Sequence, residues 1–365
     1  MTQAATRRTR LDPDVFRLPV DRIRSGWYSD QYFNLTKELL EKEDRHPQVT
    51  MQVFQRKQSL VGGIDEAVAI LKLCSGRQGP GGWEPGWDHL EVKALYEGDE
   101  VAPWETVMTI EGDYSLFAHL ETVYLGSLAR RSLVMRNVRD VVDAAHGKPI
   151  LYFPARHDHW QVQTGDGWAA HVAGAIGVST DAQASWWGGR GVGTVPHSLI
   201  AAYGGDTVAA AAAFADRYAR ETNVTVLVDF DNDSVTTAVG VADALGDRLW
   251  GVRLDTSGQL VDRALWHEMG EFKPTGVNPV LVERVRTALD DAGHPAVRIV
   301  VSGGFDAERI AEFETVGAPV DAYGVGSALL RGSNDYTADI VRVDGRDCAK
   351  VGRRRHPNPR LERVS

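Results

Sequence analysis

The feature that most constrains the fold is a pair of glycine-rich turns within residues 298–330, each of which follows an apolar run. The first run, residues 299–301, is short, β-branched and unalternating, as is typical of a buried strand. It leads into Ser-Gly-Gly at residues 302–304, after which Asp306 is placed to cap a helix. A second predicted strand ends in Gly-Val-Gly-Ser at residues 324–327. The stretch therefore predicts two successive strands, each ending in a glycine turn that leads towards a helix.

Turns of this kind suit a phosphate group. Glycine adopts positive φ without strain and lets a ligand approach the backbone closely. The N–H groups at such turns form anion-binding nests, which recur after the last strands of βα barrels. Tight packing between helix and strand, without a ligand, is the alternative explanation for the same glycines.

The remaining chain shows two patterns. Its first part mixes strand-like and helical stretches, which indicates an α+β domain, and a long helical run over residues 115–146 leads out of it. From Pro149 onward, short apolar strands alternate with helices, which implies parallel strands with right-handed crossovers. Six or seven such strands predict an irregular α/β barrel. Besides the two strands of residues 298–330, the predicted strands are residues 150–153, 175–179, 225–230 and 249–254.

Composition limits the classes of partner and the cellular compartment that are expected for this chain. The chain has 365 residues with a net charge of −10, which argues against a nucleic-acid partner or an anionic membrane. Its two cysteines, Cys74 and Cys348, cannot form a disulfide framework or a four-cysteine zinc site. No apolar stretch is long enough for a membrane span. We therefore expect a soluble, cytoplasmic protein.

Polar residues collect where the predicted strands end, the edge at which a βα barrel keeps its active site. Arg253 and Asp255 share one side of a strand under its period of two, so they could line a site or simply form a structural ion pair. His197, at a predicted helix start, could be a catalytic, a capping or a core histidine. The other residues in this group are Arg156, His157, His159, Asp229, Asp231 and Asp233.

Two sequence patterns resemble metal sites. The spacing of Asp229, Asp231 and Asp233 imitates the start of a calcium loop, but Ser234 and Gly240 replace its glycine and glutamate, which excludes an EF-hand. A magnesium–pyrophosphate role and plain helix capping remain open for these aspartates. His157 and His159 lack a third nearby ligand, which disfavours zinc. The pair Trp186-Trp187 indicates a packed aromatic wall or a stack over a flat ring.

Together, phosphate nests, a basic residue, several carboxylates and a histidine suit a phosphorylated sugar. At this point the sequence resembles the nicotinate phosphoribosyltransferases, within the type II class shared with quinolinate and nicotinamide phosphoribosyltransferases. The matching segments are SDQYF (29–33), EGDEVAPWETVMTIEGDY (97–114), FPARHDH (153–159), GTVPHSLI (193–200), GVRLDTSG (251–258), VSGGFD (301–306), YGVGSAL (323–329) and CAKVGRRRHPNP (348–359).

The resemblance implies an incomplete α/β barrel beside an α+β sandwich built from both chain termini. We therefore expect a sandwich domain with a linking helix over residues 1–147, the barrel over 148–332, and a tail over 333–365 that returns to the first domain. The implied reaction joins nicotinate to phosphoribosyl pyrophosphate (PRPP) with Mg²⁺ and gives nicotinate mononucleotide and pyrophosphate in NAD biosynthesis. ATP is the implied co-substrate, and the implied assembly is a homodimer or larger oligomer with shared active sites.

The resemblance also implies roles for individual residues. Catalytic roles fall to His197, which ATP would phosphorylate, and to Arg253, Asp255 and Asp229 at the ribose and pyrophosphate. Asp229 and Asp231 are the expected Mg²⁺ ligands. Phe153 would stack on the pyridine ring and Arg156 would pair with its carboxylate, while Asp30 and Tyr32 would reach the neighbouring subunit's site. The expected 5′-phosphate ligands are Ser302, Gly303, Gly304, Gly324, Gly326 and Ser327.

Two departures from the family pattern affect the prediction of which pyridine base is the substrate. His157 stands where many relatives carry arginine, and residues 179–191 (STDAQASWWGGRG) replace a smaller, less aromatic stretch. Quinolinate or nicotinamide is therefore the alternative substrate. A flavin- or sugar-phosphate-binding barrel is a second alternative, although it would not explain residues 193–200 or the C-terminal tail. A non-catalytic sensor of PRPP or nucleotide is a third.

Overall fold

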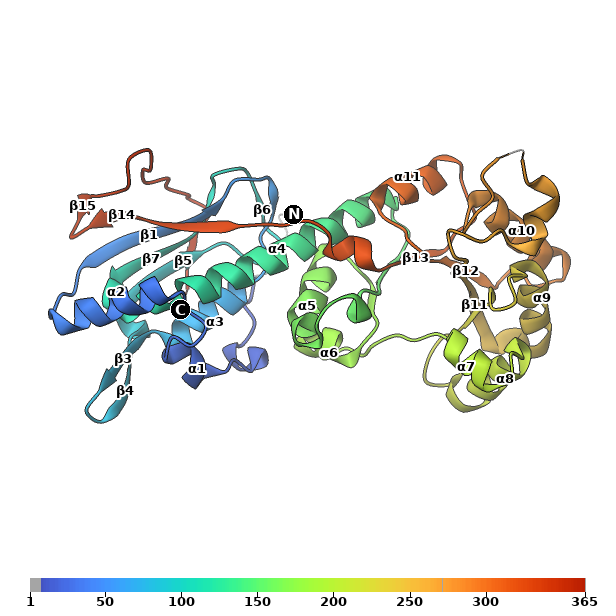
Figure 1. Ribbon diagram of the computed structural model, residues 1–365, viewed down its shortest axis with the longest axis horizontal. Coiled ribbons are helices and arrows are strands. Elements are labelled where there is room, and N and C mark those ends of the chain that lie inside the picture. Colours follow the sequence, from blue (N-terminus) through green and yellow to red (C-terminus); the bar gives the residue numbers. More distant parts are fainter. Residues whose placement is uncertain (1–7, 271, 365) are drawn as a thin grey trace, which may run out of the picture. The chain divides into compact units, whose positions relative to one another are not determined.

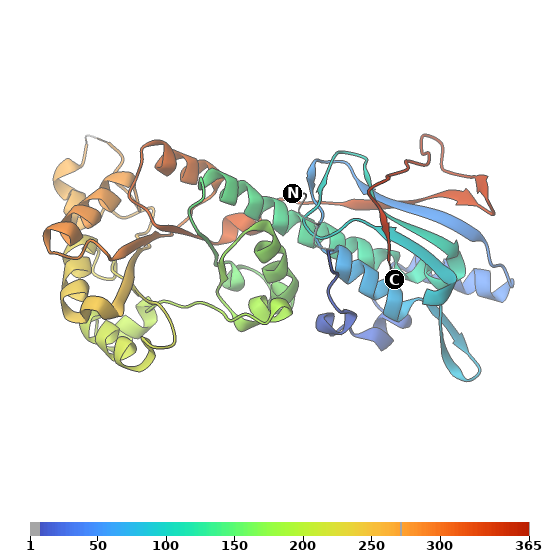
Figure 2. The same ribbon diagram turned by 180° about the vertical axis from the view of Figure 1, so that it is seen from behind.

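The computed structural model describes residues 8–270 and 272–364, so the first seven residues of the expected N-terminal domain and the last residue of the expected tail lie outside it. The chain forms two compact units. Unit 1 comprises Met1–Arg136 with Gly332–Ser365, and unit 2 comprises Asn137–Arg331 (Figures 1 and 2). The long helix α4 (Glu121–Ala144) runs from the first unit into the second.

Unit 1 is built on a six-stranded antiparallel sheet in the order β15-β14-β1-β7-β5-β16. Both ends of the chain contribute: β14 pairs with β1 from Gln55↔Tyr336 to Val49↔Val343, and β16 pairs with β5. The sandwich of N- and C-terminal parts is thereby confirmed. The strands are β1 (Gln48–Gln55), β5 (Leu90–Ala94), β7 (Thr106–Asp113), β14 (Tyr336–Val343), β15 (Arg346–Asp347) and β16 (Glu362–Arg363).

Helices cover one face of this sheet (Figures 1 and 2). The helix α3 (Ile64–Cys74) and the first half of α4 bury apolar side chains, among them Ile70 and Leu128, against Met51 and Ile110 of the strands. This continuous apolar core stabilises the unit because it removes large side chains from water. The remaining elements are α1 (Val20–Arg24), α2 (Gln31–Lys42) and the short pairs β2 (Ser59–Leu60) with β6 (Glu100–Val101) and β3 (Gly76–Gly79) with β4 (Gly82–Pro85).

Unit 2 contains a curled, all-parallel sheet in the order β10-β11-β12-β13-β8-β9, with helices packed outside it (Figures 1 and 2). Six strands leave the sheet open, which confirms the irregular, incomplete barrel. The strands are β8 (Ile150–Tyr152), β9 (Gly177–Val178), β10 (Val224–Leu227), β11 (Leu249–Leu254), β12 (Arg298–Val301) and β13 (Ala322–Val325). The helices are α5 (Gln163–Ala173), α6 (Asp181–Ala184), α7 (His197–Ala202), α8 (Thr207–Tyr218), α9 (Ser234–Leu245), α10 (Pro279–Asp291) and α11 (Ala307–Thr315).

Side-chain caps fix where several helices of unit 2 begin. Asp233, Asn278 and Asp306 each accept a hydrogen bond from a backbone N–H in the first turn of α9, α10 and α11, respectively. Asp233 therefore has the helix-capping role that the sequence left open. Because each cap sets a helix start, it also fixes the length of the turn between strand and helix, where the polar residues lie.

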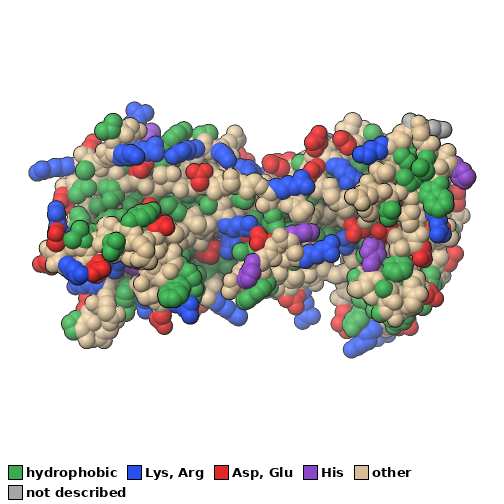
Figure 3. Space-filling view, in the orientation of Figure 1, with side chains coloured by type: hydrophobic (Ala, Val, Ile, Leu, Met, Phe, Trp, Pro, Cys, Tyr) green, Lys and Arg blue, Asp and Glu red, His purple; other side chains and the backbone are tan. Residues whose placement is uncertain are grey.

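Three general properties follow from the structure. Within the described residues, no helix is long and apolar enough to cross a membrane. Cys74 is buried, Cys348 is exposed, and both are free thiols. On the face of unit 2 drawn in Figure 3, acidic and basic side chains lie among one another.

Candidate active site

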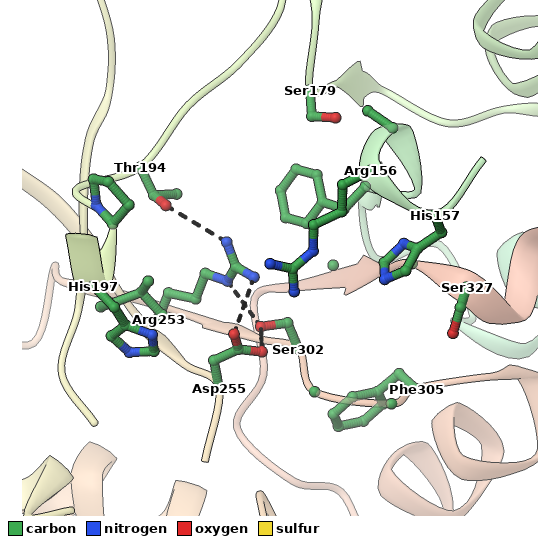
Figure 4. A pocket seen from close by; sticks show the side chains of 18 of the residues that line it. Arg156, His157, Ser179, Thr194, His197, Arg253, Asp255, Ser302, Phe305 and Ser327 are labelled. Atoms are coloured by element: carbon green, nitrogen blue, oxygen red, sulfur yellow. Dashed lines mark hydrogen bonds and ion pairs between the residues drawn. The ribbon is translucent and has the colours of Figure 1, made fainter. Parts of the chain in front are cut away.

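A pocket of about 610 Å³ opens in unit 2 at the carboxyl ends of β8, β11, β12 and β13 (Figure 4). Parallel strands bring their carboxyl ends to one edge of the sheet, which is why residues far apart in sequence meet here. Eleven of the expected site residues line it: Phe153, Arg156, His197, Arg253, Asp255, Ser302, Gly303, Gly304, Gly324, Gly326 and Ser327.

Arg253 lies at the centre of a hydrogen-bond network in this pocket (Figure 4). Its Nε donates to Ser302 Oγ at 2.8 Å, and Ser302 Oγ in turn donates to Asp255 Oδ1 at 2.7 Å. Arg253 Nη2 lies 3.6 Å from Asp255 Oδ2, and Nη1 donates to Thr194 Oγ1 at 3.5 Å. Burial lowers the pKa of Arg253, while the charge of Asp255 opposes that shift. The network holds a fixed cation and a fixed carboxylate side by side, as the period-two spacing predicted.

His197 begins α7, and its Nε2 lies 3.0 Å from Asp229 Oδ1. The hydrogen bond to Asp229 raises the pKa of His197 above its usual 6.5, against the effect of burial. The Asp229 side chain is only 6% exposed and stands behind the histidine rather than on the pocket lining. Such a carboxylate orients an imidazole ring through the nitrogen that it pairs with.

The glycines at the pocket serve two different purposes. Gly303 and Gly304 have φ of +89° and +82°, which side chains other than glycine rarely adopt. Gly324 and Gly326 have no such strain but lack room: a Cβ would lie 2.7 Å from Phe153 Cε2 at the first position and 3.0 Å from His157 Cε1 at the second. The first turn thus needs glycine for its backbone shape, and the second needs it for close approach of aromatic rings.

Phe153, Arg156 and His157 enter the pocket from the segment after β8. The Arg253 guanidinium lies over the Phe153 ring, 4.9 Å from its centroid, in cation–π geometry. The Arg156 guanidinium points into the pocket, and the His157 ring lies on the Ser327 side of it (Figure 4). A planar guanidinium that is open to the pocket can bind a carboxylate through two parallel hydrogen bonds.

Three expected site residues lie elsewhere. Asp231 is exposed and is not part of the pocket lining. Asp30 and Tyr32 belong to unit 1, where Thr122 Oγ1 donates to Asp30 Oδ2 at 2.9 Å and the Tyr32 side chain is largely exposed. Their expected contribution to a neighbouring subunit's site stays a prediction.

Neither Trp186 nor Trp187 lines the pocket. Trp186 is buried, and Trp187 stacks on His171 with ring centroids 4.3 Å apart and planes 7° apart. Of the two alternatives for this pair, a packed aromatic wall or a stack over a flat ring of a ligand, the packed wall is therefore confirmed. From the unusual stretch of residues 179–191, Ser179 alone reaches the lining.

The pocket also contains residues for which the sequence predicts no role. Thr194 and Phe305 lie inside segments quoted for the resemblance, so their neighbours gave a usable signal. Arg331 follows the last glycine turn without any motif of its own, and it forms an ion pair with Asp306 at 3.5 Å. Its position becomes visible only when the chain is folded.

Comparison with known proteins agrees with this architecture. A family model described as "Quinolinate phosphoribosyl transferase, N-terminal domain" matches residues 30–132. A crystal structure titled nicotinate-nucleotide pyrophosphorylase from Pyrococcus furiosus superposes with a TM-score of 0.78 at 32% identity, over 95% of this chain and 85% of that one. Human nicotinic acid phosphoribosyltransferase shares the fold with a TM-score of 0.62 at 18% identity, over 88% of this chain and 76% of that one.

The matching curated relatives are nicotinate phosphoribosyltransferases. The nicotinate phosphoribosyltransferase pncB1 of Mycobacterium tuberculosis is 31% identical over 264 residues, which make up 70% of this chain and 54% of the relative. The chain thus spans about half the length of the curated relatives it matches. The half-barrel and its pocket define a phosphoribosyltransferase-type α/β protein. The chain belongs to the nicotinate phosphoribosyltransferase family, within the type II phosphoribosyltransferases.

Proposed function

We propose that this chain is a nicotinate phosphoribosyltransferase that forms nicotinate mononucleotide and pyrophosphate from nicotinate and PRPP, in NAD biosynthesis. The observation that carries the proposal is the joint placement, in one pocket, of two glycine turns, the Arg253–Ser302–Asp255 network and the open guanidinium of Arg156. These groups match a phosphate, a ribosyl pyrophosphate and a carboxylate, respectively.

The turns at Gly303-Gly304 and Gly326-Ser327 would hold the 5′-phosphate of PRPP. Displacement at the ribosyl C1 passes through an oxocarbenium-like state while negative charge grows on the departing pyrophosphate. Arg253 is fixed before the reaction by Ser302 and Asp255, so it can stabilise that charge without reorganising. The ring nitrogen of nicotinate is itself a nucleophile, and a general base is therefore unnecessary.

Nicotinate would bind through Phe153 and Arg156. Arg156 would pair with the carboxylate, and the Phe153 ring would pack against the pyridine ring beside the Arg253 guanidinium. In this binding mode the pyridine nitrogen would lie near the ribose site rather than near the carboxylate partner.

Magnesium would accompany the pyrophosphate. The described residues include no group of three or more histidine, cysteine or carboxylate side chains that could enclose a metal ion. Mg²⁺ usually keeps several waters and binds through one or two carboxylates plus substrate phosphates, so Asp255 on the pocket lining would suffice as its protein partner. The expected contribution of Asp229, which lies behind His197, stays a prediction. The bound ion would neutralise charge on the leaving group. A contribution from Asp231 stays a prediction.

ATP would act through His197. With Nε2 facing Asp229, the second ring nitrogen is free to accept a phosphoryl group, and the resulting phosphohistidine would be a covalent intermediate. We further propose a cytoplasmic homodimer or larger homo-oligomer in which Asp30 and Tyr32 complete the neighbouring site.

Quinolinate is a second candidate base. Arg156, His157, Arg253 and Arg331 line one cavity, and these basic side chains could serve two carboxylates instead of one. Nicotinate remains the first choice because Arg253 is already engaged by Asp255 and Ser302.

The proposal is tested by pyrophosphate release from PRPP and Mg²⁺ in the presence of nicotinate. We expect release that depends on nicotinate and falls by roughly 10²–10³-fold in Arg253→Lys, because a lysine cannot bridge Ser302 and Asp255 with one fixed fork. Wild-type rates in Arg253→Lys would contradict the role given to the network.

A further inference from the structure

The back of the first glycine turn is held by a residue that does not line the pocket. Arg309, on α11, donates from Nη1 to Gly303 O at 2.8 Å and to Gly304 O at 3.4 Å, and from Nη2 to Val277 O. Its guanidinium also lies over the ring of Phe305, 4.4 Å from the centroid. One side chain thus joins the glycine turn to the loop that precedes α10.

Peptide geometry links these contacts to the pocket. In a trans peptide the C=O and the following N–H point in opposite directions. Because the carbonyls of Gly303 and Gly304 face Arg309, the N–H groups of Gly304 and Phe305 are directed away from it, towards the side on which this turn lines the pocket. Within the described part of the chain, neither N–H donates a hydrogen bond to a protein acceptor.

The turn needs such a constraint. Gly303 and Gly304 both have positive φ, and glycine has the widest choice of backbone conformations. A turn of two glycines would sample several orientations of its N–H groups, which would weaken an anion site that depends on their alignment. Arginine is suited to fix it because its planar fork carries several donors in a rigid arrangement.

We propose that Arg309 is a positioning residue for phosphate binding: it holds the carbonyls of the Gly303–Gly304 turn from outside the pocket, so that the turn's N–H groups stay aimed at the phosphoryl oxygens of a ribose 5-phosphate ester. The inference rests on the proposed function for the identity of that ester. Arg309 itself does not touch the substrate.

The direct test measures binding of ribose 5-phosphate by calorimetry in wild type, Arg309→Met and Arg309→Lys. We expect the Kd to rise about tenfold or more in Arg309→Met, because the contacts to the turn are lost. The rise should be smaller in Arg309→Lys, because an ammonium can hold one carbonyl but cannot bridge the glycine turn and the loop before α10. Glu308→Gln, an exposed change on the same helix, should leave the Kd unchanged.

A second readout separates positioning from a merely structural role. In the transferase assay, Arg309→Lys should raise the KM for PRPP while the KM for nicotinate and the melting temperature stay near the wild-type values. Unchanged ribose 5-phosphate binding in Arg309→Met would overturn the proposal, as would an equal loss of affinity for both substrates or a wild-type protein that does not bind ribose 5-phosphate. If wild type binds ribose 5-phosphate in an Arg309-dependent way but forms no nicotinate mononucleotide, the proposed function fails and the positioning role stands.

Discussion

Replacing Gly324 with alanine tests how closely the pocket is packed. In the structure, an alanine Cβ at this position would lie 2.7 Å and 2.8 Å from two ring carbons of Phe153, and 3.3 Å from Ser302 Cβ. The backbone of Gly324 has no positive φ, so strain of the main chain does not contribute. Any effect of the substitution therefore reports on the Phe153 ring and on Ser302.

The size of the effect follows from these distances. Ordinary contacts begin near 3.4 Å and the shortest contact would be 2.7 Å, so the ring must move by about 0.7 Å or more. Overpacking of this kind costs about 1–3 kcal/mol of stability. The movement also disturbs the Arg253 guanidinium, which lies over the same ring. Because a misplacement of about 1 Å can cost on the order of 10²-fold in rate, we expect kcat/KM for nicotinate to fall by roughly 10–100-fold.

The assay compares steady-state kinetics and thermal unfolding of Gly324→Ala with those of Gly240→Ala. Gly240 lies in α9, where the nearest heavy atom to an added Cβ is Val208 Cγ2 at an ordinary 3.8 Å, so this control should retain wild-type kinetics. Wild-type nicotinate kinetics in Gly324→Ala would show that Phe153 is not in contact with the base.

Three further predictions concern charged groups. Arg156→Ala should raise the KM for nicotinate by about 10–100-fold with a smaller effect on PRPP, because a charge-assisted pair is lost, and unchanged nicotinate kinetics would remove the carboxylate assignment. Asp229 raises the pKa of His197, and only the neutral ring can accept a phosphoryl group. ATP stimulation should therefore increase as the pH rises through that pKa, and the midpoint should move to lower pH in Asp229→Asn; an unmoved midpoint would contradict the pairing. Burial, with Asp339 and Asp30 nearby, raises the pKa of Glu121 from 4.5 to about 8. The unfolded carboxyl loses its proton first, so stability should fall as the pH rises from 4.5 to 8, and Glu121→Gln should remove up to a few kcal/mol of that loss between pH 5 and pH 8; equal pH dependence in variant and wild type would refute this.

Local sequence signals predicted much of the fold. The apolar run at residues 299–301, the glycines after it and Asp306 together predicted a buried strand, a turn and a capped helix, and β12 and α11 confirm them. The period of two along β11 predicted that Arg253 and Asp255 face the same way, and both line the pocket. These features depend on residues that are neighbours in sequence, so they can be predicted from one sequence alone.

Contacts between segments that lie far apart in the chain could not be predicted from the sequence. The sequence predicted Gly324 as a phosphate-turn glycine, and it could not show that the Phe153 ring, from the segment after β8, also leaves no room for a side chain there. The contacts of Arg309 with Gly303 and Val277 depend on a loop that no local pattern describes. Trp187 meets His171 of α5 rather than the pocket, because stacking partners are chosen by tertiary packing.

The most direct test of the account is the identity of the product formed from PRPP and Mg²⁺ with nicotinate, nicotinamide or quinolinate, each with and without ATP. We expect the mononucleotide of nicotinate, formed faster with ATP, and little product from the other two bases. Preferred turnover of quinolinate or nicotinamide would contradict the assignment of Arg156 to a single carboxylate. PRPP binding without turnover of any base would contradict the proposal that the chain is an enzyme.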